Sequence, residues 1–287
     1  MHKNHGHLNK EGDRIFPGIE IFKELGNDRP QLKAVIFDFD GTISTLRQGW
    51  EEIMEPLMIE MITGGGLPDD QLTREVKEYI DESTGIQTIF QMQWLEKEVR
   101  RRGYNPQVHD AWWYKDVYNR RLLDMVKTRA EKLEQGESSP EDFMIKGSKE
   151  FIQALHNMGL KLYVASGTDH GDVVREVTAL GLYDYFEQIS GAPERKVDCS
   201  KEAVIRLLIE TMGFKGEELL VIGDGKVEIA LGVEAGALTL GVAADEVKRE
   251  GLNPAKRERL IKAGAHMIIE DYSCGKEALS ILFSSED

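Results

Sequence analysis

Cysteine is scarce in this sequence, because its 287 residues include only Cys199 and Cys274. Two thiols cannot build a disulfide framework, and we expect both to be free in a reducing compartment. Long apolar runs are also missing: none approaches the ~18 residues that a membrane span needs. The N-terminal stretch lacks the apolar segment of a signal peptide. We therefore expect a cytoplasmic protein with no membrane partner.

Basic residues are few compared with acidic ones. The chain has 36 Lys and Arg against 51 Asp and Glu, which gives a formal net charge of −15. Such a surface repels phosphate backbones, so we expect no nucleic-acid partner. A small phosphorylated substrate stays possible, because a local cationic pocket can override the net charge.

Short apolar strands alternate with helical patterns over most of the chain, which predicts a parallel sheet with helices on both faces. The first strand covers residues 32–37. The later strand candidates are 160–165, 186–190, 219–222, 237–242 and 267–269. The helices between them are expected near 147–158, 170–180, 200–213, 226–235, 254–264 and 274–283. The fold class is therefore α/β, with a Rossmann-like parallel sheet.

Residues 45–146 differ from the rest because they contain almost no strand signal. Helical periodicity covers four stretches, 47–62, 69–83, 87–102 and 107–134. We interpret this block as a helical cap inserted into an α/β core of residues 32–44 and 147–287. Residues 1–31 are polar apart from one short apolar patch, and we expect an N-terminal extension that packs loosely on the core.

The most informative stretch is Asp38-Phe39-Asp40-Gly41-Thr42, directly after the first strand. Alternation along an extended chain places the two carboxylates on the same side. Gly41 allows a sharp turn without steric cost. Because two close like charges resist joint ionisation, one pKa should rise, which suits one group to attack and the other to move protons.

Polar residues also follow two later strands. Ser166-Gly167-Thr168 follows the strand at 160–165, and Asp224 and Glu228 follow the strand at 219–222. Lys201 opens the helix between them. Since open parallel sheets bind ligands at the carboxyl ends of their strands, these groups should meet Asp38 and Asp40 at one edge.

These residues, in this order, resemble the four motifs of the haloacid dehalogenase-like (HAD) hydrolase superfamily. The resemblance covers about residues 32–285. It implies the HAD fold and, from the position of residues 45–146 after the first motif, a C1 cap like that of the phosphoglycolate phosphatase and beta-phosphoglucomutase subgroup. In that subgroup the cap closes over the site and contacts the leaving group.

The resemblance also implies roles for the site residues. Asp38 would be the nucleophile that forms an aspartyl-phosphate, and Asp40 the general acid and base. Mg²⁺ would be held by Asp38, the Asp40 backbone carbonyl and Asp224, with Glu228 as a further candidate. The remaining residues would bind the phosphoryl group, namely Thr42, Ser166, Gly167 and Lys201.

Three points stay open at this stage. Lys196 competes with Lys201 for the lysine motif, and we favour Lys201 because it begins a helix. Glu228 is one methylene longer than the Asp commonly found there, so it would ligate the metal directly, hold a metal-bound water or orient the lysine. In the cap, Arg47 is our candidate for recognising an anionic substrate, because it lies just beyond the first motif.

The sequence thus predicts a Mg²⁺-dependent phosphatase acting on a small phosphorylated metabolite, such as a sugar phosphate or a phosphoglycolate-like acid. One alternative is a phosphomutase that passes the phosphoryl group to a sugar phosphate. The other is a non-catalytic binding module. Asp40 argues against a dehalogenase, because dehalogenases of this superfamily lack the second Asp.

Overall fold

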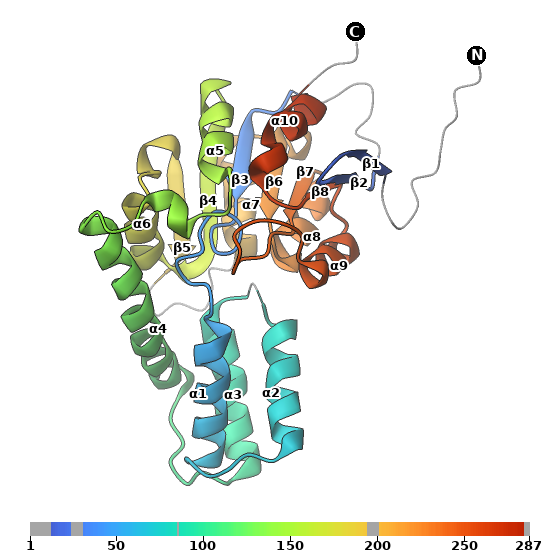
Figure 1. Cartoon of the computed structure of the whole chain (residues 1–287). Helices are drawn as coiled ribbons and strands as arrows, with labels where there is room; N and C mark the ends of the chain where they lie inside the picture. The colour runs from blue at the N-terminus through green and yellow to red at the C-terminus, as the bar shows by residue number, and fades with distance from the viewer. Residues whose placement is uncertain (1–12, 24–30, 85, 194–200, 284–287) are drawn as a thin grey trace.

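The computed structural model describes residues 13–23, 31–84, 86–193 and 201–283. Its strands form one sheet in the order β1-β2-β8-β7-β6-β3-β4-β5 (Figure 1). The strands from β8 to β5 are parallel, and β2 pairs with β8 in the antiparallel sense. Their bounds are β1 (Asp13–Phe16), β2 (Ile19–Ile21), β3 (Ala34–Phe37), β4 (Lys161–Asp169), β5 (Gln188–Ala192), β6 (Leu219–Gly223), β7 (Leu238–Val242) and β8 (Met267–Ile269).

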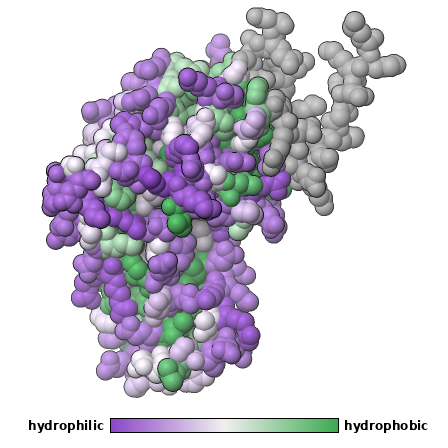
Figure 2. Space-filling view, in the orientation of Figure 1, coloured by the Kyte–Doolittle hydropathy of each residue, from purple (hydrophilic) through white to green (hydrophobic). Residues whose placement is uncertain are grey.

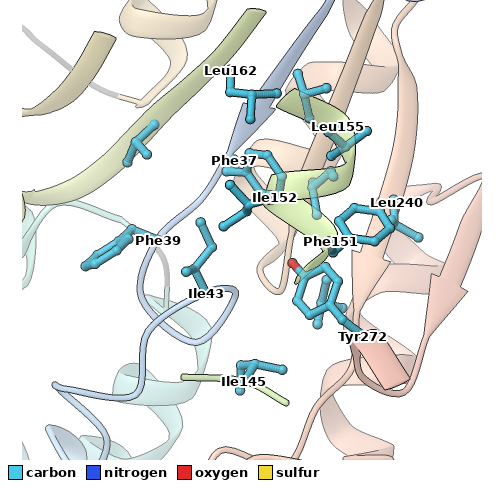
Figure 3. Packing of buried hydrophobic residues seen from close by; sticks show 14 of the residues in the cluster. Phe37, Phe39, Ile43, Ile145, Phe151, Ile152, Leu155, Leu162, Leu240 and Tyr272 are labelled. Atoms are coloured by element: carbon cyan, nitrogen blue, oxygen red, sulfur yellow. The ribbon is translucent and has the colours of Figure 1, made fainter. Parts of the chain in front are cut away.

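The central strands are buried on both faces, which explains their continuous apolar runs. In β3, Val35 and Phe37 join one apolar cluster, whereas Ala34 and Ile36 join another on the opposite face. Figure 3 shows Phe37 packed among residues of α5, including Ile152. The core helices are α5 (Ser148–Asn157), α6 (His170–Ala179), α7 (Lys201–Met212), α8 (Lys226–Glu234), α9 (Pro254–Ala263) and α10 (Gly275–Phe283). The predicted α/β class is confirmed.

The inserted helices form a second body beyond the carboxyl ends of the central strands (Figure 1). They are α1 (Glu51–Thr63), α2 (Asp70–Glu82), α3 (Thr88–Arg102) and α4 (Ala111–Glu134). These helices bury an apolar cluster of their own, separate from the clusters of the sheet. Figure 2 shows mostly hydrophilic residues on the visible face of both bodies, with small hydrophobic patches between helices. The division into core and cap stays a prediction that this packing supports.

The expectation of a loosely packed N-terminal extension is wrong for part of that segment. Strand β2 extends the sheet by pairing with β8, and Ile19 and Ile21 are buried in the main core. The buried carboxylate of Glu20 accepts from the Arg257 guanidinium at 2.6 Å. A strand of three residues is too short for alternation to reveal, and its pairing partner lies about 250 residues further along the chain.

His266 gives a prediction about stability and pH. Its Nδ1 lies 2.7 Å from Thr239 Oγ1, which also accepts from the His266 backbone N–H. Burial lowers the pKa of His266 to about 4. Because the folded-state pKa lies below the unfolded value, the stabilisation is complete above about pH 6.5 and is lost as the pH falls towards 4. Between pH 7.5 and 5.0 we expect a loss of about 1–2 kcal/mol from this residue.

The His266→Asn variant isolates that contribution, because the amide oxygen can replace Nδ1 as an acceptor but does not titrate. Urea unfolding at both pH values, in both proteins, gives the difference directly. Carboxylates titrate alike in the two proteins and cancel. Equal pH losses in wild type and variant would contradict the prediction.

Candidate active site

The carboxyl ends of β3, β4 and β6 bring the predicted residues together. These strands are parallel neighbours, with β3 in the middle. Asp38 follows β3 directly, Ser166 lies in the last part of β4, and Asp224 follows β6. All three side chains are buried. These three residues therefore lie together at one edge of the sheet, as expected. Their chemical roles stay predictions.

The loop after β3 is folded tightly on itself. The backbone N–H groups of Ile43 and Ser44 both donate to the Phe39 carbonyl, at 2.9 Å each. Gly41 has a φ of +73°, a value that side chains on L-residues disfavour. Phe39 and Ile43 are buried in the main apolar cluster (Figure 3). This apolar anchoring fixes the loop that carries the two aspartates.

Thr42 joins two of the carboxylates. Its hydroxyl lies 3.4 Å from Asp38 Oδ2 and 3.2 Å from Asp224 Oδ1. The side chain is fully buried. These contacts connect the loop after β3 to the loop after β6. The assignment of Thr42 to phosphate binding stays a prediction, and the contact seen in the structure is with the carboxylates.

Asp40 is oriented by hydroxyl groups from the neighbouring strand. Its Oδ2 accepts from Ser166 Oγ at 3.2 Å and from Thr168 Oγ1 at 2.7 Å. Ser166 Oγ in turn accepts from the Thr168 backbone N–H at 3.1 Å. Gly167 lines the same cavity. Thr168 was not among the predicted site residues, although its position two residues after Ser166 on an extended chain places it on the same side.

Asp38, Asp224 and Glu228 form a buried acidic cluster, with one carboxylate oxygen of each within 4.8 Å of the others. One Glu228 oxygen also accepts from the Gly225 backbone N–H at 2.6 Å. A set of carboxylate oxygens is the donor chemistry that Mg²⁺ prefers. The residues present therefore fit the predicted metal, with Glu228 close enough to belong to the group.

A lysine that the sequence did not single out lies beside this cluster. The Lys256 ammonium is 2.6 Å from Asp224 Oδ2 and 2.7 Å from Glu246 Oε1. Lys256 is buried in the first turn of α9. The two predicted candidates cannot be compared with it: Lys196 lies outside the described residues, and Lys201 begins α7 without a described side chain. The choice between those two stays open.

Arg47 is held by carboxylates of α6. It contacts Glu176 through Nε and Nη2, at 3.0 and 2.6 Å, and Asp172 through Nη2 at 3.3 Å. Its Nε is 3.9 Å from Asp40 Oδ1. Burial raises the pKa of Glu176 to about 7, against the opposing effect of Arg47. Burial alone would lower the pKa of Arg47, but the surrounding carboxylates raise it above its usual value.

A cavity of about 290 Å³ opens between these residues and the cap. The cap contributes aromatic, apolar and neutral polar side chains to its wall, together with the charged side chains of Arg47 and Glu51, and the core contributes four further carboxylates. In the cap wall are Arg47, Gln48, Trp50, Glu51, Thr84, Ile86, Thr88, Gln91, Tyr118 and Leu122. A further contact closes the cap on the core: the Lys115 ammonium and the Asn119 amide both bind Asp169, at the end of β4.

The comparisons with known proteins agree with this geometry. The family model described as haloacid dehalogenase-like hydrolase matches residues 32–236. The chain belongs to this family. The match covers the first motif, Ser166 and Asp224, and leaves α9 outside. No curated protein matches the chain.

Solved structures share the HAD fold at low sequence identity. A predicted phosphatase from Clostridium acetobutylicum is 17% identical with a TM-score of 0.56, over 87% of this chain and 99% of that one. The beta-phosphoglucomutase from Clostridium difficile is 14% identical, TM-score 0.57, over 84% and 91%. A haloacid dehalogenase-like hydrolase from Streptococcus pneumoniae is 17% identical, TM-score 0.52, over 87% and 98%.

Among the described residues, no helix is both long enough and apolar enough to cross a bilayer.

Proposed function

We propose that this HAD protein is a Mg²⁺-dependent phosphomonoesterase that works through an aspartyl-phosphate on Asp38. The observation that carries the proposal is the pairing of two differently held carboxylates. Both line the cavity, but Asp38 belongs to the buried acidic cluster, whereas Asp40 lies outside that cluster and accepts from two hydroxyls. Different surroundings suit two neighbouring carboxyl groups to different tasks.

In the first step, an Asp38 oxygen attacks phosphorus and the bond from phosphorus to the ester oxygen breaks. Asp40 donates its proton to the departing oxygen, then takes a proton from the water that hydrolyses the aspartyl-phosphate. Ser166 and Thr168 hold Asp40 in position for both transfers. Asp38, Asp224 and Glu228, with the Asp40 carbonyl, would hold Mg²⁺, which would supply the positive charge that lets two anions meet. The cap keeps bulk water out.

The leaving group that best fits the cavity is a neutral, hydroxylated alcohol. Each of the three cationic side chains in the described cavity wall already contacts carboxylates: Arg47, Lys256 and Arg259. An acidic leaving group would have to displace one of these contacts. Neutral hydroxyl and amide groups, from Thr88, Gln91 and Tyr118, suit the hydroxyls of a sugar or polyol. We therefore favour a sugar phosphate over a phosphoglycolate-like acid.

A substrate panel tests this assignment. Phosphate release is measured with Mg²⁺ for neutral sugar monophosphates, phosphoglycolate and para-nitrophenyl phosphate. We expect the highest kcat/KM for a sugar monophosphate. Isomerised sugar phosphate without free phosphate would identify the phosphomutase instead. No turnover of any ester, together with no Mg²⁺ binding, would identify a binding module.

Removing divalent cations should abolish turnover. The buried acidic cluster repels a phosphoryl dianion, so without a cation the substrate cannot approach Asp38. After dialysis against a chelator, we expect phosphate release to fall at least ~10²-fold and Mg²⁺ to restore it. The control is circular dichroism of the stripped protein, which should show an unchanged fold. Full activity after verified metal removal would contradict metal dependence.

A further inference from the structure

Lys256 connects three segments of the site with one ammonium group. Besides Asp224 and Glu246, its Nζ lies 3.4 Å from the Gly41 carbonyl in the loop after β3. These acceptors come from the loops that follow β3, β6 and β7. An ammonium has three donors, and three acceptors surround it. Lys256 is therefore a fixed charge in the wall of the cavity, held on several sides.

Lys256 lies at hydrogen-bonding distance from two carboxylates, those of Asp224 and Glu246. An ammonium held in this way offsets part of the negative charge of the acidic group. Its nearest contact is Asp224 Oδ2, an oxygen of the same carboxylate that belongs to the acidic cluster. A cation bound by that cluster must share Asp224 with Lys256.

We propose that Lys256 is a positioning residue that serves as an internal counter-cation of the metal site. It holds the Asp224 carboxylate against the Gly41 loop and competes with the divalent cation for it. The proposal rests on the proposed metal site but not on which alcohol leaves. Two consequences follow from the same contact: without Lys256 the cluster should bind Mg²⁺ more tightly, and Asp224 should be less well placed for turnover.

The test compares Lys256→Met with Arg259→Met by calorimetric titration of the metal-stripped full-length protein with Mg²⁺. Arg259 is the matched control because it also lies on α9 and lines the same cavity, but contacts Asp81 rather than the acidic cluster. We expect about tenfold tighter Mg²⁺ binding, or more, for Lys256→Met, and a change within about threefold for Arg259→Met. The kcat of Lys256→Met at saturating Mg²⁺ should fall. A purely structural role would not produce tighter metal binding with slower turnover.

The Lys256→Met/Glu246→Gln double variant covers the case in which the single variant does not fold. It removes both partners of the ion pair between Lys256 and Glu246, so residue 246 is not left as a buried carboxylate without its counter-charge. We still expect tighter Mg²⁺ binding than in wild type, because the competing ammonium is gone. Unchanged or weaker Mg²⁺ affinity in either folded variant would overturn the proposal. If the wild type itself binds no Mg²⁺, the metal site fails, and with it the proposal.

Discussion

Asp38→Asn is expected to reduce phosphate release by at least ~10³-fold, because an amide cannot attack phosphorus in place of a carboxylate. The fold should persist. Asparagine has nearly the same shape, and its oxygen can keep the contact with Thr42. Removing one charge from a buried group of three carboxylates also relieves repulsion. Unfolding in urea without metal should therefore show equal or higher stability than wild type.

Asp40→Asn is the matched comparison, since it makes the same chemical change two residues away. It leaves the proposed nucleophile intact but removes the proposed proton donor. With para-nitrophenyl phosphate, whose leaving group needs little protonation, we expect an initial burst of nitrophenol and then slow turnover. Mass spectrometry should detect a phosphate adduct on Asp40→Asn and none on Asp38→Asn. Wild-type turnover in Asp38→Asn would show that Asp38 is not the nucleophile.

The strand-end residues were predictable because they obey a geometric rule. Parallel strands end at one edge, so Asp38, Ser166 and Asp224 were expected at that edge once 32–37, 160–165 and 219–222 were recognised as strands of one sheet. That these strands are neighbours comes from the structure. The same rule applies to β7, which is followed within four residues by Glu246, so that carboxylate carried a usable signal. Each of these residues is placed by its own strand, without reference to side-chain packing.

Lys256 had no such signal. It is one of many lysines in the chain and lies on a polar helix. Its contact with Gly41 joins residues 215 positions apart. Only the packing of α9 against the sheet turns its side chain into the cavity. The same reason applies to Arg47, whose partners Glu176 and Asp172 lie on α6, more than 120 residues away. Tertiary packing decides which side chains from distant elements become neighbours. The periodicity of the sequence does not encode this packing.

Gly41 has one property that the sequence predicts and one that only the tertiary structure reveals. The turn it permits was predictable from the sequence, because glycine adopts a positive φ without steric cost. A second requirement was not: a Cβ at this position would lie 2.5 Å from Asp224 Oδ2 and 3.0 Å from Glu246 Oε1. The loop after β3 and the loop after β6 approach each other closely only because residue 41 has no side chain. Gly41 therefore has two roles: it forms the turn, and its lack of a side chain leaves room for the Asp224 carboxylate.

Gly41→Ala should consequently impair both stability and catalysis. The positive φ costs about 1–2 kcal/mol for an alanine, and the methyl group must displace Asp224 from its present position. Since a shift of about 1 Å in a catalytic group can cost on the order of 10²-fold, we expect kcat/KM to fall by that amount and Mg²⁺ affinity to change with it. Urea unfolding, steady-state kinetics and Mg²⁺ titration measure the three effects.

Gly236→Ala separates strain from displacement. Gly236 has a φ of +75°, close to that of Gly41, but a Cβ there would meet nothing within 4 Å. This variant should lose a similar ~1–2 kcal/mol of stability while keeping wild-type kcat/KM and Mg²⁺ affinity. If Gly41→Ala behaves like Gly236→Ala in all three measurements, the close approach of Asp224 is not required for activity. If only Gly41→Ala loses metal binding and turnover, the absence of a side chain at residue 41 is what allows the residues that follow β3 and β6 to form one site.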